Sequence, residues 1–209
     1  MKKILIAIPT MDMVPMGFAQ SLAMLNKVGE CVVSSVVGSL IYDARNKLAA
    51  QAIKMEADYI MWFDSDMIFQ ADTLEKLMKD MDEGRDMVSG LYFRRVSPFT
   101  PVALSKFGDI VDNEAKTIEN YSGELKGIHE VEGVGFGCVL MKTDVIYDCF
   151  AKYGTCFSPI GQIGEDLSFC YRARELGYKI FLDCDVKLGH VGHLIVTEQA
   201  YRSLHGGET

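Results

Sequence analysis

Short apolar runs and amphipathic segments alternate along the first half of the chain. A continuous apolar run is typical of a strand buried on both faces of a sheet, and apolar residues at helical spacing predict a helix that covers the sheet. The predicted strands are Lys2–Ile8, Cys31–Val37, Tyr59–Phe63 and Asp86–Gly90. The predicted helices are Met16–Lys27, Asp43–Ala57 with Asp43 as N-cap, and Asp72–Gly84 with Asp72 and Glu75 as a capping-box-like pair. This alternation predicts βαβ units and a mainly parallel sheet.

The second half has a different pattern. Residues Arg94–Glu130 contain two prolines and short alternating runs, which predict a small antiparallel meander or a lid over the sheet. An apolar run over Val131–Met141 is interrupted by three glycines, and a short helix is expected at Thr143–Ala151. A helix over Glu165–Leu176 precedes a strand at Tyr178–Leu182. The whole pattern predicts an α/β, Rossmann-like fold, with a mainly parallel sheet flanked by helices and a small antiparallel part in the second half.

Composition narrows the class of protein. The chain has 209 residues, of which 49% are hydrophobic, and it shows no repeats or linkers, so we expect a single domain over residues 1–209. A formal net charge of −8 argues against a nucleic-acid partner, which would require a basic surface. The six cysteines form no CxxC pair and lie mostly in apolar segments, which indicates buried, reduced thiols in a cytoplasmic protein. No apolar run approaches the length of a membrane span.

Two carboxylates follow the third predicted strand. Asp64 and Asp66 come directly after Tyr59–Phe63, and ligands of open α/β sheets bind at the carboxyl ends of the strands. Because two anions this close repel each other, we expect a divalent metal held by their oxygen atoms. A turn that caps the next helix is the structural alternative, and an aspartyl nucleophile is another. An EF-hand loop is excluded, since Ile68 and Phe69 stand where an oxygen ligand and a glycine are required.

Four further residues have side chains that suit catalysis or substrate binding. Glu165 and Asp166 open a helix, where acidic residues commonly act as caps. An ionised Asp166 that faced the same ligand as Asp66 could act as a general base. Arg45 and Asn46, near the start of another helix, offer phosphate or nucleotide contacts, or else form an ordinary surface pair.

A glycine-rich segment and two late histidines complete the candidates. The segment Gly133–Gly137 is not a dinucleotide fingerprint, because its glycines precede a strand and not a helix. Its bare backbone either permits close approach of a ligand or marks a bulge. His190 and His193 follow the last predicted strand, and an imidazole beside carboxylates suits Mn²⁺ better than Mg²⁺.

In this order and spacing, these segments resemble the GT-A glycosyltransferases, and in particular the compact family-2-like members. The resemblance covers Lys2 to about Gly192, nearly the whole chain. It depends on six motifs: Ile8-Pro9-Thr10, Ala44-Arg45-Asn46, Asp64-Ser65-Asp66, the glycine-rich strand at Gly133–Leu140, Glu165-Asp166 and His190-Val191-Gly192.

The resemblance implies a metal-dependent enzyme that transfers a sugar from a nucleotide-diphosphate sugar to a hydroxyl acceptor, which is a saccharide, a protein or a small molecule. The implied cofactor is Mn²⁺ or Mg²⁺. Asp66 would bind the metal that bridges the diphosphate, Asp64 would contact the metal, ribose or sugar, and His190 would complete the metal site. Asp166 matches the general base of inverting members, with Glu165 beside it. Further substrate contacts are expected at Pro9, Thr10, Arg45, Asn46, Ser65, Gly135, Phe136 and Gly137.

The resemblance also divides the chain and leaves alternatives. Residues 1–93 form the nucleotide-binding half, 94–193 the acceptor and metal-completing half, and 194–209 a tail. Ser34-Ser35-Val36 replaces the acidic residue that commonly ends the second strand, which leaves the nucleotide open. His193 could replace His190 as metal ligand, and retaining members share much of the pattern. Two other classes of protein are possible. One is a nucleotidyltransferase, although the glycine-rich phosphate loop of that class is absent after Ile8. The other is a non-catalytic nucleotide- or carbohydrate-binding module.

Overall fold

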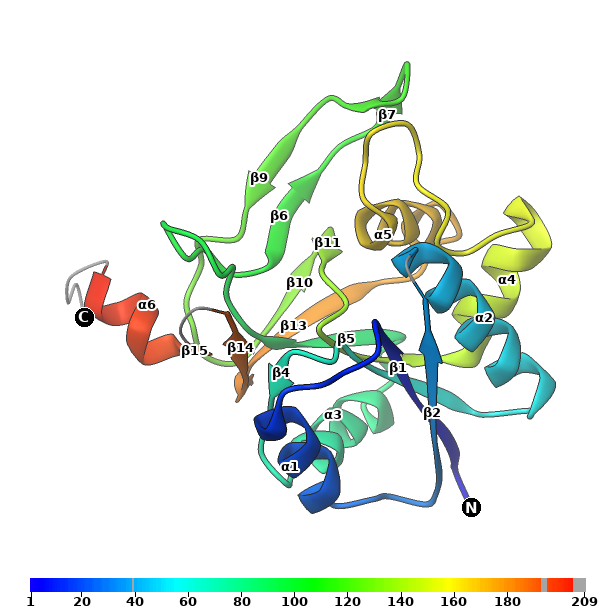
Figure 1. The fold of residues 1–209 in the computed structure, drawn as a ribbon. Coiled ribbons are helices and arrows are strands. Elements are labelled where there is room, and N and C mark those ends of the chain that lie inside the picture. The colour runs from blue at the N-terminus through cyan, green and yellow to red at the C-terminus, as the bar shows by residue number, and fades with distance from the viewer. Residues whose placement is uncertain (39, 193–194, 205–209) are drawn as a thin grey trace.

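A seven-stranded sheet forms the centre of the molecule (Figure 1). The structure is a computed structural model that describes residues 1–38, 40–192 and 195–204. Across the sheet the strand order is β10-β13-β5-β12-β3-β1-β2. The strands are β1 (Lys3–Thr10), β2 (Glu30–Val37), β3 (Tyr59–Phe63), β5 (Met87–Leu91), β10 (Ile128–Val131), β12 (Cys138–Lys142) and β13 (Ile180–Lys187).

Five of these seven strands run in one direction. β1 pairs in parallel with β2 and β3, and β5 pairs in parallel with β13, whereas β12 is antiparallel to β3 and β5 and β10 is antiparallel to β13. The predicted α/β fold with a mainly parallel sheet is therefore confirmed. The position of β12 between β3 and β5 was not predicted. Hydrophobic periodicity identifies a strand but does not show with which strands it pairs.

Helices cover both faces of the sheet. On one face lie α2 (Ile41–Lys54), α4 (Thr143–Tyr153) and α5 (Glu165–Glu175), and on the other lie α1 (Met16–Met24) and α3 (Thr73–Asp82) (Figure 1). Successive side chains of a strand point to opposite faces, so Leu5 and Ala7 of β1 pack with the first group and Ile4 and Ile6 with the second. This burial on both sides is the reason why the strands are continuous apolar runs.

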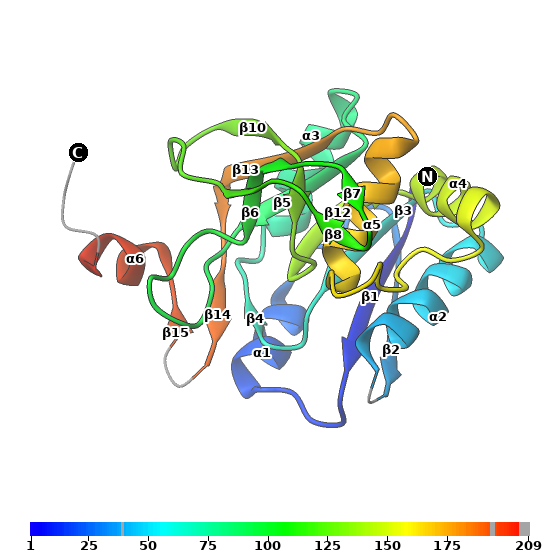
Figure 2. The same cartoon turned by 90° about the horizontal axis from the view of Figure 1, so that it is seen from above.

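The second half adds small antiparallel sheets, as its alternating pattern predicted. In Figure 1, β6, β7 and β9 extend above the central sheet, whereas β4, β14 and β15 lie on the side of α1 and α6, and α6 lies at the opposite side of the molecule from α4 (Figures 1 and 2). One sheet has the order β11-β6-β9, a second is the β7-β8 hairpin, and the third has the order β15-β14-β4. Their bounds are β4 (Met67–Ile68), β6 (Ala103–Phe107), β7 (Ile110–Val111), β8 (Glu114–Ala115), β9 (Ile118–Asn120), β11 (Gly133–Val134), β14 (Gly189–Val191) and β15 (Ile195–Val196), followed by α6 (Glu198–Leu204).

Predicted helix ends and one predicted capping pair differ from the structure. Helix α2 begins at Ile41, so Asp43 lies in its first turn and pairs with Lys47 at 2.6 Å, four residues on, instead of capping it. Asp72 occupies the N-cap position of α3 but forms no side-chain cap hydrogen bond, and its Oδ2 pairs with Lys76 at 2.9 Å. The predicted capping box is therefore wrong. Helix α1 ends at Met24 and not at Lys27, since the backbone N–H of Asn26 bonds to the carbonyl of Ala71 at 2.8 Å.

The described residues have neither a helix that could span a membrane nor a disulfide bond. None of the helices in this part of the chain is long and apolar enough to cross a membrane. All six cysteine side chains are free thiols, and five of them are buried.

Candidate active site

The candidate site begins where β3 ends. Residues 60–63 are fully buried in the sheet between β1 and β12. Burial of an unpaired charged side chain in such an interior costs free energy. The chain therefore turns at Asp64, whose carbonyl accepts a hydrogen bond from the N–H of Met67 at 3.2 Å. A cavity of about 430 Å³ opens at this edge of the sheet. It brings together charged or titratable side chains from five separate segments: Arg45, Asp64, Asp66, Tyr92, Arg94, Arg95, Glu165, Asp166 and His190.

Arg45 links the end of β3 to the start of α5. Its guanidinium is 3% exposed and pairs with Asp64 Oδ1 through Nη2 at 2.8 Å and with Glu165 Oε1 through Nε at 3.3 Å. The ring centroids of Trp62 and Phe136 lie 5.9 and 5.2 Å from its Cζ. Its Nη1 is buried without a hydrogen-bond partner within the described chain. A buried cation needs anionic partners, so Arg45 holds two of the predicted site carboxylates in fixed positions.

Asp166 lies in the first turn of α5 and faces the cleft. Its Oδ1 accepts a hydrogen bond from the N–H of Leu167 at 2.7 Å. Burial, aided by the neighbouring charge of Glu165, raises the pKa of Asp166 to about 6, although the Leu167 bond and Arg45 act in the opposite direction. Such a carboxylate is mostly ionised at pH 7 yet more basic than an ordinary aspartate, as proton abstraction from a hydroxyl requires.

Asp66 is contacted by two residues that lie far away in the sequence. Its Oδ2 lies 2.9 Å from Arg95 Nη1 and 3.5 Å from His190 Nε2. Burial acts to raise the pKa of Asp66, but the interactions with His190 and Arg95 outweigh it and lower the pKa. Asp66 is therefore firmly ionised, and the predicted meeting of Asp66 with His190 is observed.

The donor atoms at Asp66 and His190 fit a divalent cation. His190 Nδ1 lies 2.9 Å from the carbonyl oxygen of Phe93, and because a carbonyl can only accept, Nδ1 carries the proton. Nε2 is the ring atom that faces the Asp66 carboxylate. A cation bound between them would be ligated by the deprotonated Nε2 and a carboxylate oxygen, and the Phe93 bond supplies the outer contact that orients a ligating histidine.

The predicted set of three protein ligands is not assembled. Asp64 pairs with Arg45, and no group of three His, Cys, Asp or Glu side chains positioned to hold a metal ion is found among residues 1–38, 40–192 and 195–204. The alternative ligand His193 lies outside the described residues. The metal and its ligands therefore stay a prediction.

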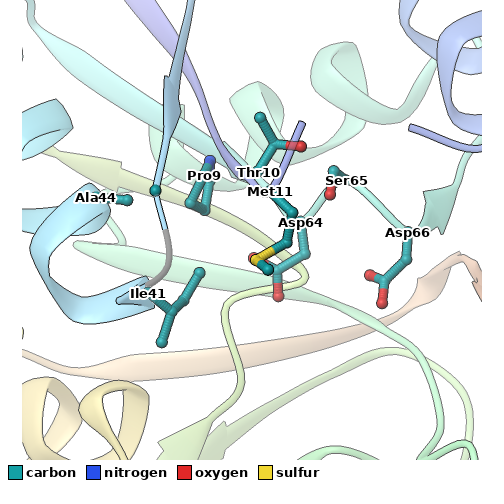
Figure 3. A pocket seen from close by; sticks show the side chains of 9 residues that line it. Pro9, Thr10, Met11, Ile41, Ala44, Asp64, Ser65 and Asp66 are labelled. Atoms are coloured by element: carbon teal, nitrogen blue, oxygen red, sulfur yellow. The ribbon is translucent and has the colours of Figure 1, made fainter. Parts of the chain in front are cut away.

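A second cavity, of about 190 Å³, adjoins the two aspartates (Figure 3). Figure 3 shows Pro9 and Thr10, from the end of β1, beside the loop that carries Ser65. The hydroxyl oxygen of Thr10 is buried and has no hydrogen-bond partner in the described part of the chain. Parallel strands β1 and β3 end at the same edge, which explains why residues so far apart in the sequence line one cavity. The structure thus brings Pro9, Thr10 and Ser65 together with Asp64 and Asp66, as a shared substrate site requires.

Asn46 lies outside both cavities. Its Oδ1 accepts hydrogen bonds from the backbone N–H groups of Cys156 and Phe157 at 3.1 and 3.0 Å and from the hydroxyl of Thr155 at 3.4 Å. This side chain fastens the loop between α4 and α5 to α2. Its predicted substrate contact stays a prediction.

The glycine-rich segment contacts a residue that sequence reasoning missed. A side chain at Gly135 would overlap the hydroxyl of Tyr92, and a Cβ at Gly137 would lie 2.7 Å from the Tyr92 ring. Phe136 between them is 1% exposed and packs against Arg45. The glycines thus provide room for Tyr92, which lines the larger cavity. Its position just after a predicted strand, at the same sheet edge as Asp64, is the signal that could have identified it.

The fold defines the class of protein: a mainly parallel sheet with helices on both faces and small antiparallel sheets is that of the GT-A fold. The model of the family described as "Glycosyl transferase family 2" matches residues 31–150, which is more than half of the chain. The chain therefore belongs to glycosyl transferase family 2, and this membership supports glycosyltransferase activity.

Comparison with solved structures supports the fold. The crystal structure of A197 from STIV superposes with a TM-score of 0.68 at 17% sequence identity, and the match covers 93% of each chain. At this identity the similarity concerns the fold alone. No curated protein matches the sequence.

Proposed function

We propose that the protein is a metal-dependent, inverting glycosyltransferase that moves a sugar from a nucleotide-diphosphate sugar to a hydroxyl acceptor. The observation that carries the proposal is the convergence of Asp64, Asp66, Glu165 and Asp166 on one cleft. Two guanidinium groups, Arg45 and Arg95, pair with these carboxylates. Arg94 also lines the cleft, and four carboxylates against three guanidinium groups leave an excess of negative charge, which a divalent cation would offset.

In this proposal, Asp166 accepts the proton of the acceptor hydroxyl while the oxygen attacks the sugar. Arg45 keeps Glu165 and Asp64 on either side of the reacting groups, since it binds both carboxylates from a buried position. Pro9, Thr10 and Ser65 line the neighbouring cavity, which suits the nucleotide. Asp66 and His190 would hold the cation, Mn²⁺ or Mg²⁺. When bound, this ion supplies positive charge to the departing diphosphate.

The cellular setting belongs to the same proposal. Six free cysteine thiols suit a reducing compartment such as the cytoplasm. The acceptor is any molecule that presents a hydroxyl group at Asp166, and the chemistry of the cleft does not require a particular nucleotide.

Thermal denaturation with nucleoside diphosphates tests the proposal. We expect UDP or GDP at about one hundred times its Kd to raise the Tm by about 5 °C or more in the presence of Mn²⁺, and to have no effect in EDTA. Asp66→Ala should abolish this shift and the metal-dependent hydrolysis of a sugar donor, because it removes the proposed ligand. Asp82→Ala is the matched control, since Asp82 is an exposed carboxylate at the end of α3, outside both cavities.

Other outcomes would identify the rival classes. Stabilisation by a diphosphate without metal, or retention of the shift in Asp66→Ala, would contradict the metal role. Stabilisation without any turnover would favour a non-catalytic binding module, and turnover of a nucleoside triphosphate with a sugar phosphate would favour a nucleotidyltransferase.

A further inference from the structure

Tyr92 occupies a central place in the cleft that the proposed reaction does not yet use. It follows β5 directly and is 4% exposed, yet its side chain lines the cavity that contains Asp64 and Asp166. The bare backbone of Gly135 and Gly137 makes room for its hydroxyl and ring. Two glycines are thus required at this point for a tyrosine to reach the cleft.

The hydroxyl of Tyr92 has an unused donor. Its oxygen accepts a hydrogen bond from the N–H of Gly137 at 3.0 Å. No acceptor for its own O–H group is found among the hydrogen bonds of the described residues. A tyrosine hydroxyl both donates and accepts, and a buried donor without a partner costs free energy. The O–H group is therefore available to a ligand in the cleft.

The surroundings of this hydroxyl determine which ligand suits it. Both Asp64 and Asp166 are close enough to influence Tyr92 electrostatically. A Cβ at Gly135, which would overlap the Tyr92 hydroxyl, would lie 3.6 Å from Asp166 Oδ2, so both side chains border the same space. Arg45 acts on Tyr92 in the opposite direction, but two carboxylates against this one guanidinium leave a net negative charge that disfavours a phosphate oxygen at this point. A sugar hydroxyl is neutral, and it can accept a bond from Tyr92 while it donates one to a carboxylate.

We propose that Tyr92 binds a hydroxyl group of the transferred sugar and thereby selects donors that carry this hydroxyl. The inference depends on the proposed function, because it assigns the space between Asp64 and Asp166 to the sugar. A site built to hydrogen-bond a hydroxyl discriminates against an analogue that lacks it, since the protein group is then left without a partner.

The test compares Tyr92→Phe with the wild-type enzyme. Phenylalanine keeps the ring that packs against Gly137 and His190, where the ring centroids are 5.5 Å apart, and removes the hydroxyl, which is also the acceptor of the Gly137 N–H. We expect kcat/KM for the accepted sugar donor, chosen from UDP-glucose, UDP-galactose and GDP-mannose, to fall roughly 5- to 30-fold. The Kd of UDP or GDP with Mn²⁺ should change less than twofold, because the nucleoside diphosphate lacks the sugar.

Tyr121→Phe is the matched control. Tyr121 is 6% exposed and donates its hydroxyl to the carbonyl of Glu124 at 2.7 Å, outside both cavities. The same substitution there removes one hydroxyl bond from a buried ring and should leave kcat/KM unchanged.

Deoxy analogues of the accepted donor identify the hydroxyl. For one analogue, the wild type should lose a similar factor in kcat/KM, and Tyr92→Phe should then be equal to the wild type, because the interaction is already absent. The wild-type series gives this information even where the variant folds poorly.

Three results would overturn the inference. They are an unchanged kcat/KM in Tyr92→Phe, an equal loss in the affinity for UDP or GDP, and a penalty that persists with every deoxy donor. The second result would assign the hydroxyl to the diphosphate. Failure of the proposed function is recognised separately, since the wild type itself would then show no metal-dependent binding or turnover.

Discussion

At the scale of single residues, the two aspartates of the Asp64-Ser65-Asp66 motif are not equivalent. Burial raises the pKa of Asp64, and Asp66 adds to this effect although Arg45 opposes it. The pKa of Asp66 is lowered, because His190 and Arg95 overcome the effect of burial. Environments that shift neighbouring acids in opposite directions commonly separate their roles. Here they separate Asp64, which is paired with the buried Arg45, from Asp66, which is paired with the half-exposed Arg95.

The pKa of Asp166 leads to a prediction about activity. If Asp166 is the general base, kcat/KM should rise with pH through a midpoint near 6, the pKa of its carboxylate in the free enzyme. Asp166→Asn should lower kcat by roughly 100-fold or more, because the amide accepts no proton, while the Kd of the nucleoside diphosphate stays within twofold. Steady-state kinetics between pH 5 and 8 and a binding titration measure both.

The raised pKa of Asp166 also makes the free energy of unfolding depend on pH. An acid whose pKa is raised from about 4 to about 6 in the folded state binds more protons there than in the unfolded state, so stability falls as pH rises between these values. Asp166→Asn should therefore unfold at a higher urea concentration than the wild type above pH 6, and at the same concentration below about pH 4. If Asp166→Asn were less stable than the wild type at pH 7, burial would not destabilise the ionised carboxylate.

At the scale of elements, helix α2 connects two parts of the molecule through adjacent residues. Arg45 points to the acids of the cleft, and Asn46 holds the loop that precedes α5. This loop leads to Glu165 and Asp166, so α2 helps to position the proposed base from both sides. Arg45 and Asn46 were predicted together as substrate contacts. Successive side chains of a helix point about 100° apart, so two adjacent residues can contact different parts of the protein, and the sequence does not show which parts these are.

Substitution of Asn46 separates its structural contact from a substrate contact. Asn46→Ala leaves the N–H groups of Cys156 and Phe157 without an acceptor and should lower the free energy of unfolding by about 2–4 kcal/mol, measured by urea denaturation. Asn46→Asp is the control, since its carboxylate oxygens can accept the same bonds. If Asn46→Asp kept its stability but lost affinity for the nucleoside diphosphate, a substrate contact would be indicated in addition.

At the scale of the whole molecule, one buried pair of acids links a helix to the central sheet. Asp80 of α3 and Asp183 of β13 are 5% and 6% exposed. Burial, together with the charge of Asp183, raises the pKa of Asp80 to about 7, although Arg85 acts in the opposite direction. Two carboxyl groups this close share a proton more readily than both ionise. The sequence shows Asp80 within an amphipathic helix and contains no sign that it faces another acid.

This pair predicts how stability depends on pH. The folded state holds the Asp80 proton up to about pH 7, whereas the unfolded state loses it near pH 4, so stability should fall as pH rises from 4 to 7. Asp80→Asn should be more stable than the wild type at pH 8, and the difference should shrink to nothing below about pH 4. Urea denaturation at pH 4, 6 and 8 measures this. A difference that did not vary with pH would exclude a shared proton.

The expected division into a nucleotide-binding half and an acceptor half stays a prediction about function. In the structure, β12 and β13 belong to the second half but lie within the same sheet as β1 and β3. The two halves therefore share one core, and a cut near residue 93 would remove strands from its middle.

The sequence by itself determined the α/β class, most strands and helices, and the acidic residues at the end of β3 and the start of α5. These features are local, because apolar periodicity and the residue types at element ends are properties of short segments. The tertiary structure decided that β12 enters between β3 and β5, that Arg45 pairs with Asp64 and Glu165, and that Asp66 meets Arg95 and His190. Partners in these contacts come from distant segments, and only the order of strands in the sheet brings them to one edge.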